Sequence, residues 1–288
     1  MKTSLWISCL MLLTGFLNIE TVSMQQDPIM LHKITGEGKP LVLVPGGLTG
    51  WISWDPFVTH FSKEKKVIQV QLLNVQYGLE NKNLPANYTV RTESKALEAA
   101  LISANLHEKA DFIGWSFGGL VLLDYALNHP EKIRTLTLIE PPALWIIKKD
   151  IEKDPELRKA LDFMSSFPGP DKMITEDDLE RFLNFAGFSK PGVSVRDIPQ
   201  WKGWLNFRQS LRNTRAVQMH DDDPERVRKF PAPVLLVKGT GSAHFLHRII
   251  DALDDNFPHA QVVEYQGGHA AHLVSRDQFL EAIDSFQR

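Results

Sequence analysis

The chain has 288 residues, of which 43% are hydrophobic and 23% charged, a composition typical of a globular protein rather than a disordered, collagen-like or coiled-coil one. Its 32 basic and 35 acidic residues give a formal net charge of -3 with no basic block, so it lacks the positive charge that nucleic-acid binding requires. One cysteine excludes a disulfide framework and any cysteine-based metal site.

The N-terminal segment has the pattern of a signal peptide. Lys2 precedes an apolar run over residues 5–17, and small or polar residues follow up to Ser23. The run is shorter than the roughly 20 apolar residues that cross a bilayer, so no stable membrane span is expected. We predict a leader over residues 1–23 and a secreted or periplasmic protein. Translation from Met24 would instead give a cytoplasmic one.

From about Ile29 onward, short apolar runs alternate with segments of helical periodicity. The apolar runs predict strands at 41–44, 67–73, 111–113, 135–139, 233–237 and 261–265. Helical spacing predicts helices at 92–106, 117–127 and 277–286. Continuously apolar strands that alternate with helices predict an α/β fold with a mostly parallel sheet and helices on both faces.

The alternation stops between residues 142 and 230, where helical starts occur without a convincing strand. Thr175 and the acidic residues after it resemble a helix N-terminus. We therefore predict a core over 24–141 and 231–288, with a helical cap at 142–230 inserted before the last two strands. The cap is rich in aromatic residues: Trp145, Phe163, Phe182, Phe185, Trp201, Trp204 and Phe207. A few of them should face a cleft below, since a lid over a sheet edge needs an apolar underside.

Residues 114–118 read Gly-Trp-Ser-Phe-Gly and match the pattern G-x-S-x-G. A predicted strand leads into the motif and a predicted helix leads out, which is the setting of a nucleophile elbow. Ser116 is therefore the candidate nucleophile. The N-terminal amides of the following helix would face the negative charge that develops during acyl transfer.

A serine hydroxyl needs a general base to become a good nucleophile. His269 follows Gly267 and Gly268 directly after the last predicted strand, at the edge where open α/β sheets place reactive groups. It is the candidate base. His272 is expected to be structural, and His244 is a candidate for lining the pocket.

These motifs resemble those of the α/β-hydrolase fold superfamily, and the resemblance extends over residues 29–288. Pro45-Gly46-Gly47 stands where the family has its His-Gly oxyanion segment, and Gly268-His269 matches the family's Gly-His. The resemblance implies an oxyanion hole made by the backbone N–H groups of Gly47 and Phe117.

The third member of the triad departs from the commonest family pattern. The acid usually follows the strand before the last, but Ser242 occupies that place here, and Asp251 is expected inside a helix. Glu140 ends the strand 135–139 directly before two prolines. Some superfamily members resemble this arrangement, so Glu140 is the candidate acid.

The resemblance implies a serine hydrolase but does not fix its substrate. We predict cleavage of a carboxylic ester or lactone of a small to medium, largely apolar substrate, with no cofactor and no metal. Residues 221–223 are three successive aspartates that we interpret as a solvated loop. The alternatives are a carbon–carbon bond hydrolase or a cofactor-free haloperoxidase with the same triad, and a non-enzymatic ligand-binding protein on this fold.

Overall fold

The computed structural model describes residues 28–188 and 192–288, and the expected leader at 1–23 lies outside this range. Seven strands form one sheet in the order β1-β3-β2-β4-β5-β6-β7. All neighbouring pairs are parallel except β1 with β3. The strands are β1 (His32–Thr35), β2 (Lys39–Val44), β3 (Lys65–Val70), β4 (Ala110–Trp115), β5 (Ile133–Ile139), β6 (Val234–Gly239) and β7 (Ala260–Tyr265). The predicted fold class is confirmed.

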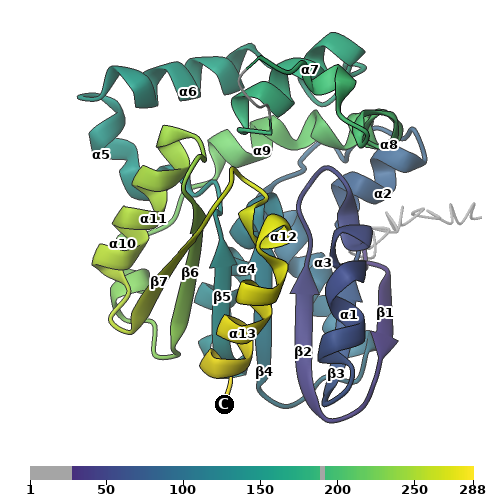
Figure 1. The fold of residues 1–288 in the computed structure, drawn as a ribbon, viewed down its shortest axis with the longest axis vertical. Coiled ribbons are helices and arrows are strands. Elements are labelled where there is room, and N and C mark those ends of the chain that lie inside the picture. Colours follow the sequence, from purple (N-terminus) through teal and green to yellow (C-terminus); the bar gives the residue numbers. More distant parts are fainter. Residues whose placement is uncertain (1–27, 189–191) are drawn as a thin grey trace, which may run out of the picture.

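Helices cover both faces of this sheet (Figure 1). On one face α1 (Asp55–Phe61) and α13 (Arg276–Phe286) pack on alternate strand residues such as Leu43 and Ile113. On the other, α3 (Val90–Ser103), α4 (Ser116–Asn128) and α11 (His244–Asn256) pack on the intervening residues, such as Val42 and Phe112. Because side chains alternate across a strand, burial on both faces explains the continuous apolar runs.

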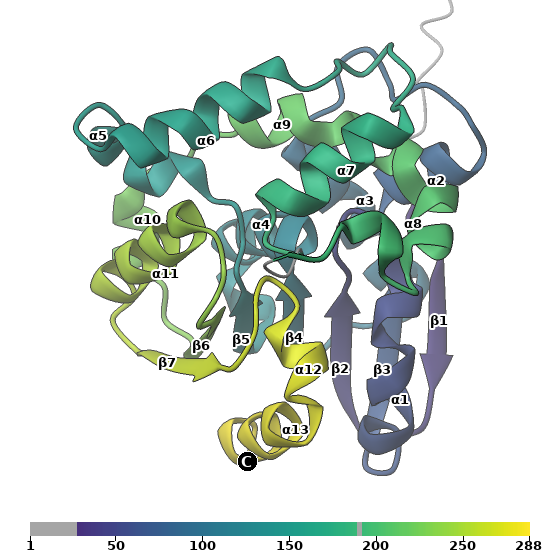
Figure 2. The same cartoon turned by 45° about the horizontal axis from the view of Figure 1, so that its top comes forward.

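All described elements between β5 and β6 are helices, and all but the last, α10 (Pro224–Arg228), lie at the carboxyl ends of the strands (Figure 2). They are the 3₁₀ helices η3 (Leu144–Ile147), η4 (Val195–Asp197) and η5 (Arg208–Asn213), with α5 (Lys148–Ile151), α6 (Pro155–Ser166), α7 (Glu176–Phe185), α8 (Trp201–Phe207), α9 (Thr214–Met219) and α10 (Pro224–Arg228). At the start of α7, Thr175 and Asp178 form the reciprocal hydrogen bonds of a capping box, as its sequence indicated.

In the N-terminal half, one predicted strand has the wrong end and one strand was not predicted. The strand predicted over 67–73 ends at Val70, and Leu73 already begins helix α2 (Leu73–Leu79). The Glu93 carboxylate accepts the backbone N–H groups of Leu73 and Asn74, so a distant side chain starts this helix. Strand β1 was not predicted because most of its residues are exposed and it has no apolar run.

The remaining elements are two 3₁₀ helices, η1 (Gly50–Trp54) and η2 (Pro130–Lys132), and the short helix α12 (Ala271–Val274) before the last helix. None of the helices that the structure describes is long and apolar enough to cross a membrane.

Candidate active site

Ser116 is the first residue after β4 and the first of α4. Its φ of 54° lies in the left-handed region, which non-glycine residues rarely adopt. The flanking glycines allow the sharp turn: a Cβ on Gly118 would lie 2.0 Å from the Pro45 carbonyl oxygen, and one on Gly114 would lie 2.9 Å from the Gly119 Cα. The local structure is therefore the elbow that the motif predicts.

The structure brings the three predicted side chains into one hydrogen-bonded chain. Ser116 Oγ lies 2.7 Å from His269 Nε2, and His269 Nδ1 lies 2.6 Å from Glu140 Oε2. His269 and Glu140 are buried, with 5% and 1% exposure. A carboxylate at Nδ1 places the proton there and leaves Nε2 free to accept the serine proton.

The second oxygen of Glu140 is also used. Glu140 Oε1 accepts the backbone N–H of Gly239 at 2.7 Å, at the end of β6. The last residue of β6, directly before the loop where the family's acid usually lies, thus contributes a backbone amide to the carboxylate that follows β5. Ser242 Oγ is buried and has no hydrogen-bond partner among the described residues, whereas Asp251 lies on α11 with its side chain half exposed beside Lys238.

Trp115 joins the segments that carry these groups. Its indole Nε1 donates to the His269 carbonyl oxygen at 3.0 Å, which holds the loop after β7. A Cβ on Gly46 would lie 2.9 Å from the Trp115 ring, so the loop after β2 packs directly on the indole. This packing brings Gly47 against Phe117, the residue after Ser116: a Cβ on Gly47 would lie 3.0 Å from Phe117 Cβ.

A cavity of about 880 Å³ opens above Ser116 and is lined by both core and cap residues. Of the aromatic cap residues, Phe163, Phe182, Phe185 and Trp204 line it, but Trp145, Trp201 and Phe207 do not. Its described lining contains one carboxylate, Asp197, and no lysine or arginine. The prediction of an apolar underside to the cap is therefore confirmed for four of the seven aromatic residues.

Two other histidines differ in their placement. His244 does not line the cavity as proposed; it begins α11, and its Nε2 lies 2.9 Å from an Asp154 oxygen near the surface. Because α11 starts there, the side chain faces the cap helix α6 instead of the site. His272 is fully buried among Trp54, Phe57, Trp115 and Phe279, which agrees with a structural role.

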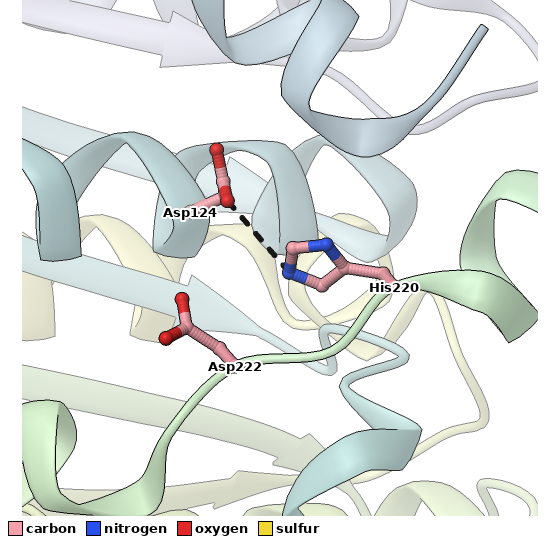
Figure 3. A group of neighbouring side chains, drawn as sticks. All are labelled: Asp124, His220 and Asp222. Carbon is pink, nitrogen blue, oxygen red and sulfur yellow. Dashed lines mark ion pairs between the residues drawn. The ribbon is translucent and has the colours of Figure 1, made fainter. Parts of the chain in front are cut away.

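Asp222, from the acidic run 221–223, lies close to Asp124 and His220 (Figure 3), with one potential ligand atom of each within 4.8 Å of the others. Both carboxylates are already paired: Arg91 lies 3.2 Å from Asp124, and Arg226 lies 2.8 Å from Asp222. These arginines balance the negative charge that would attract a cation. The group therefore links the segment after α9 to helix α4.

The alpha/beta hydrolase fold family profile matches residues 39–275. The chain belongs to this family. It is 25% identical over 261 residues to a pimeloyl-[acyl-carrier protein] methyl ester esterase of Aliivibrio salmonicida, covering 87% of this chain and 93% of the relative. It is 27% identical over 176 residues to a 2-hydroxy-6-oxo-2,4-heptadienoate hydrolase of Pseudomonas putida, covering 56% of this chain and 59% of the relative.

Among solved structures, a hydrolase from Pseudomonas aeruginosa superimposes with a TM-score of 0.71 at 17% identity, covering 89% of this chain and 93% of that one. At this identity the match shows the fold alone. The relatives are enzymes of differing chemistry, so the family establishes a hydrolase-type enzyme and leaves its substrate to be argued from the site.

Sequence reasoning missed the groups that surround the candidate oxyanion hole. Asn74 Nδ2 donates to the carbonyl oxygens of Gly47 and Ser210, at 2.8 and 2.9 Å. Asn213 lines the cavity beside Gly47. Neither asparagine belongs to a motif, and both are brought to the site by contacts between segments far apart in the chain.

Proposed function

We propose that the chain is a serine hydrolase that cleaves a carboxylic ester or lactone of a small to medium, largely apolar substrate through an acyl-enzyme intermediate. The observation that carries this proposal is the continuous contact from Glu140 through His269 to Ser116 at the floor of an apolar cavity. Such a triad generates a nucleophile beside a pocket that excludes water from the acyl chain.

The proposed reaction begins when Ser116 Oγ attacks the carbonyl carbon. Its proton moves to His269 Nε2, and the imidazolium that forms is stabilised by the Glu140 carboxylate. The negative charge on the former carbonyl oxygen is stabilised by the N–H groups of Gly47 and Phe117. His269 then protonates the leaving alcohol, and a water activated by the same histidine releases the acid.

The described lining of the cavity favours neutral substrates over carboxylates. A substrate such as a dienoate carries a negative charge, and burying it without a cationic partner is costly. The described lining offers Asp197 and no lysine or arginine. The chemistry of the lining therefore supports a neutral ester or lactone ahead of a dienoate, the kind of substrate in the name of the Pseudomonas putida relative.

A fluorophosphonate probe and a panel of p-nitrophenyl esters test this proposal. The wild-type protein should be labelled at Ser116, and Ser116→Ala should lose labelling and several orders of magnitude in turnover. Neutral acyl esters should have a higher kcat/KM than half-esters of dicarboxylic acids of equal length. Unlabelled wild-type protein without esterase activity would refute the proposal. Turnover of a dienoate but of no ester would favour the carbon–carbon hydrolase.

A further inference from the structure

Asn213 places a side-chain amide in the lining of the cavity. It is the last residue of η5 and only 6% exposed, yet its side chain lines the apolar cavity above Ser116. Its amide nitrogen lies beside Gly47, which lines the same cavity. A polar group kept in an apolar pocket is expected to meet a polar partner, and a bound substrate would supply it.

The amide of Asn213 lies beside the two residues of the proposed oxyanion hole. A Cβ built on Gly47 would lie 3.2 Å from Asn213 Nδ2 and 3.0 Å from Phe117 Cβ. The amide nitrogen therefore packs against Gly47 on the side that Phe117 also approaches. A substrate oxygen held by the Gly47 and Phe117 N–H groups would lie beside this third donor.

A buried contact fixes this arrangement. Asn74, 1% exposed, donates one N–H to Gly47 O and another to Ser210 O, so it joins the loop after β2 to the 3₁₀ helix that ends in Asn213. Asn74 is itself held by its backbone N–H, which donates to Glu93 at 2.8 Å. The position of Asn213 over Gly47 is therefore set from the core as well as from the cap.

We propose that Asn213 Nδ2 donates a third hydrogen bond to the oxyanion, so that the cap completes the oxyanion hole. This inference rests on the proposed function. When the Ser116 Oγ–carbon bond forms and the serine proton passes to His269, the carbonyl π electrons move to the substrate oxygen. That oxygen then accepts hydrogen bonds from Gly47 N–H, Phe117 N–H and Asn213 Nδ2–H. Asn74 acts through its two carbonyl partners and is a positioning residue.

Two variants of Asn213 test the donor. Asn213→Ala removes the amide, and Asn213→Asp keeps its shape but replaces the donor with a negatively charged oxygen. We expect kcat to fall about 10–10² fold in the first, below the 10²–10³ found for a principal oxyanion donor, and at least as far in the second. KM should change little, because the bound substrate carries no negative charge on that oxygen until the tetrahedral intermediate begins to form. Asn206→Ala and Asn206→Asp, on the exposed side of α8, are matched controls that should retain wild-type rates.

The rate of Ser116 phosphonylation by the fluorophosphonate gives a readout that needs no known substrate, because that reaction also places negative charge in the oxyanion hole. In the Asn213 variants this phosphonylation rate should fall by the same factor as kcat. The inhibition constant of a trifluoromethyl ketone should rise by a similar factor, and the melting temperature should not change. If Asn213 had only a structural role, its variants would have a lower melting temperature, and the phosphonylation rate, kcat and inhibition constant would not change by similar factors. If Asn213→Ala does not fold, the isosteric Asn213→Asp carries the same test.

The outcomes separate the two proposals. The donor role is overturned if the wild-type protein is labelled at Ser116 and both Asn213 variants have labelling rates and kcat values within twofold of the wild type. That result leaves the proposed function standing. Wild-type protein that is neither labelled nor active overturns the proposed function, and the donor role with it.

Discussion

Ser116 and Glu140 occupy equivalent positions on neighbouring strands. Each is the first residue after its strand, and the residues before them, Trp115 and Ile139, are paired in the register of β4 with β5. Both have a left-handed backbone, with φ of 54° and 43°. The two turns direct both side chains to one histidine, and a left-handed conformation costs a non-glycine residue roughly 1–2 kcal/mol.

The strain at Ser116 predicts an unusual order of stabilities. Ser116→Gly should be more stable than Ser116→Ala by about 1 kcal/mol, because glycine adopts positive φ without a steric penalty. Chemical denaturation of the two inactive variants measures the difference. Ala126→Gly, in the interior of the same helix, is the control with the opposite sign, since glycine there costs about 1 kcal/mol. Equal stability of the two Ser116 variants would contradict the strain.

Glu140 should be the acid on which turnover depends. Glu140→Gln keeps the side-chain shape but no longer stabilises the imidazolium, so turnover should fall by about 10³–10⁴ with the fold intact. Steady-state kinetics and circular dichroism together measure this. Asp251→Asn and Ser242→Ala, on the segment that holds the acid in most of the family, should cost far less. A nearly normal Glu140→Gln enzyme beside an inactive Asp251→Asn enzyme would show that the acid is wrongly assigned.

Three phenylalanines form a stack that crosses from cap to core. Phe163 and Phe185 have parallel rings 4.0 Å apart, and Phe185 and Phe245 have parallel rings 5.0 Å apart. All three line the cavity. Since Phe185 is in the middle, it should contact the acyl chain of a long ester but not that of an acetate.

Phe185→Ala should therefore alter selectivity between chain lengths. We expect kcat/KM to fall roughly tenfold for octanoate esters, in line with the loss of apolar contact, and to stay within threefold for acetate. The ratio of the two specificity constants is the measurement. Phe207→Ala, a cap aromatic outside the cavity lining, should leave that ratio unchanged. An equal fall for both esters would indicate loss of structure rather than of a chain-binding wall.

The sequence predicts the fold well where the physical signal is local. Apolar runs such as 41–44 and 135–139 lie in strands buried on both faces, and the glycines around Ser116 mark a turn that needs close backbone approach. Strand β1 escapes prediction because an exposed edge strand has no such run. The start of α2 could not be predicted from the local sequence, because Glu93, 20 residues after Leu73, caps that helix.

The residues of the candidate site could likewise be predicted from the sequence only where a local signal marks them. Ser116 and His269 lie in short glycine-containing motifs, and Glu140 is indicated by the absence of a carboxylate at the usual place. Asn74 and Asn213 have no local signal, since their importance comes from backbone carbonyls and a cavity that exist only after the cap has packed on the core.

His272 should make the protein sensitive to acid. Burial, with a smaller effect of the nearby His269, lowers the pKa of His272 to about 3, and neither ring nitrogen has a hydrogen-bond partner among the described residues. The unfolded chain binds a proton at this group below about pH 6.5, its ordinary pKa. Between pH 6.5 and 3 the unfolded state therefore holds more protons than the native state, and the free energy of unfolding falls as the pH falls.

Replacing this histidine tests that contribution. His272→Phe should have a shallower loss of unfolding free energy between pH 6.5 and 4 than the wild type, because phenylalanine fits an aromatic site and binds no proton. Urea denaturation at a series of pH values measures the two slopes, and their difference removes the contribution of the carboxylates common to both proteins. His107→Phe, at an exposed position, should keep the wild-type slope. Parallel slopes for His272→Phe and the wild type would mean that His272 is protonated in the native state and that its buried ring has a partner.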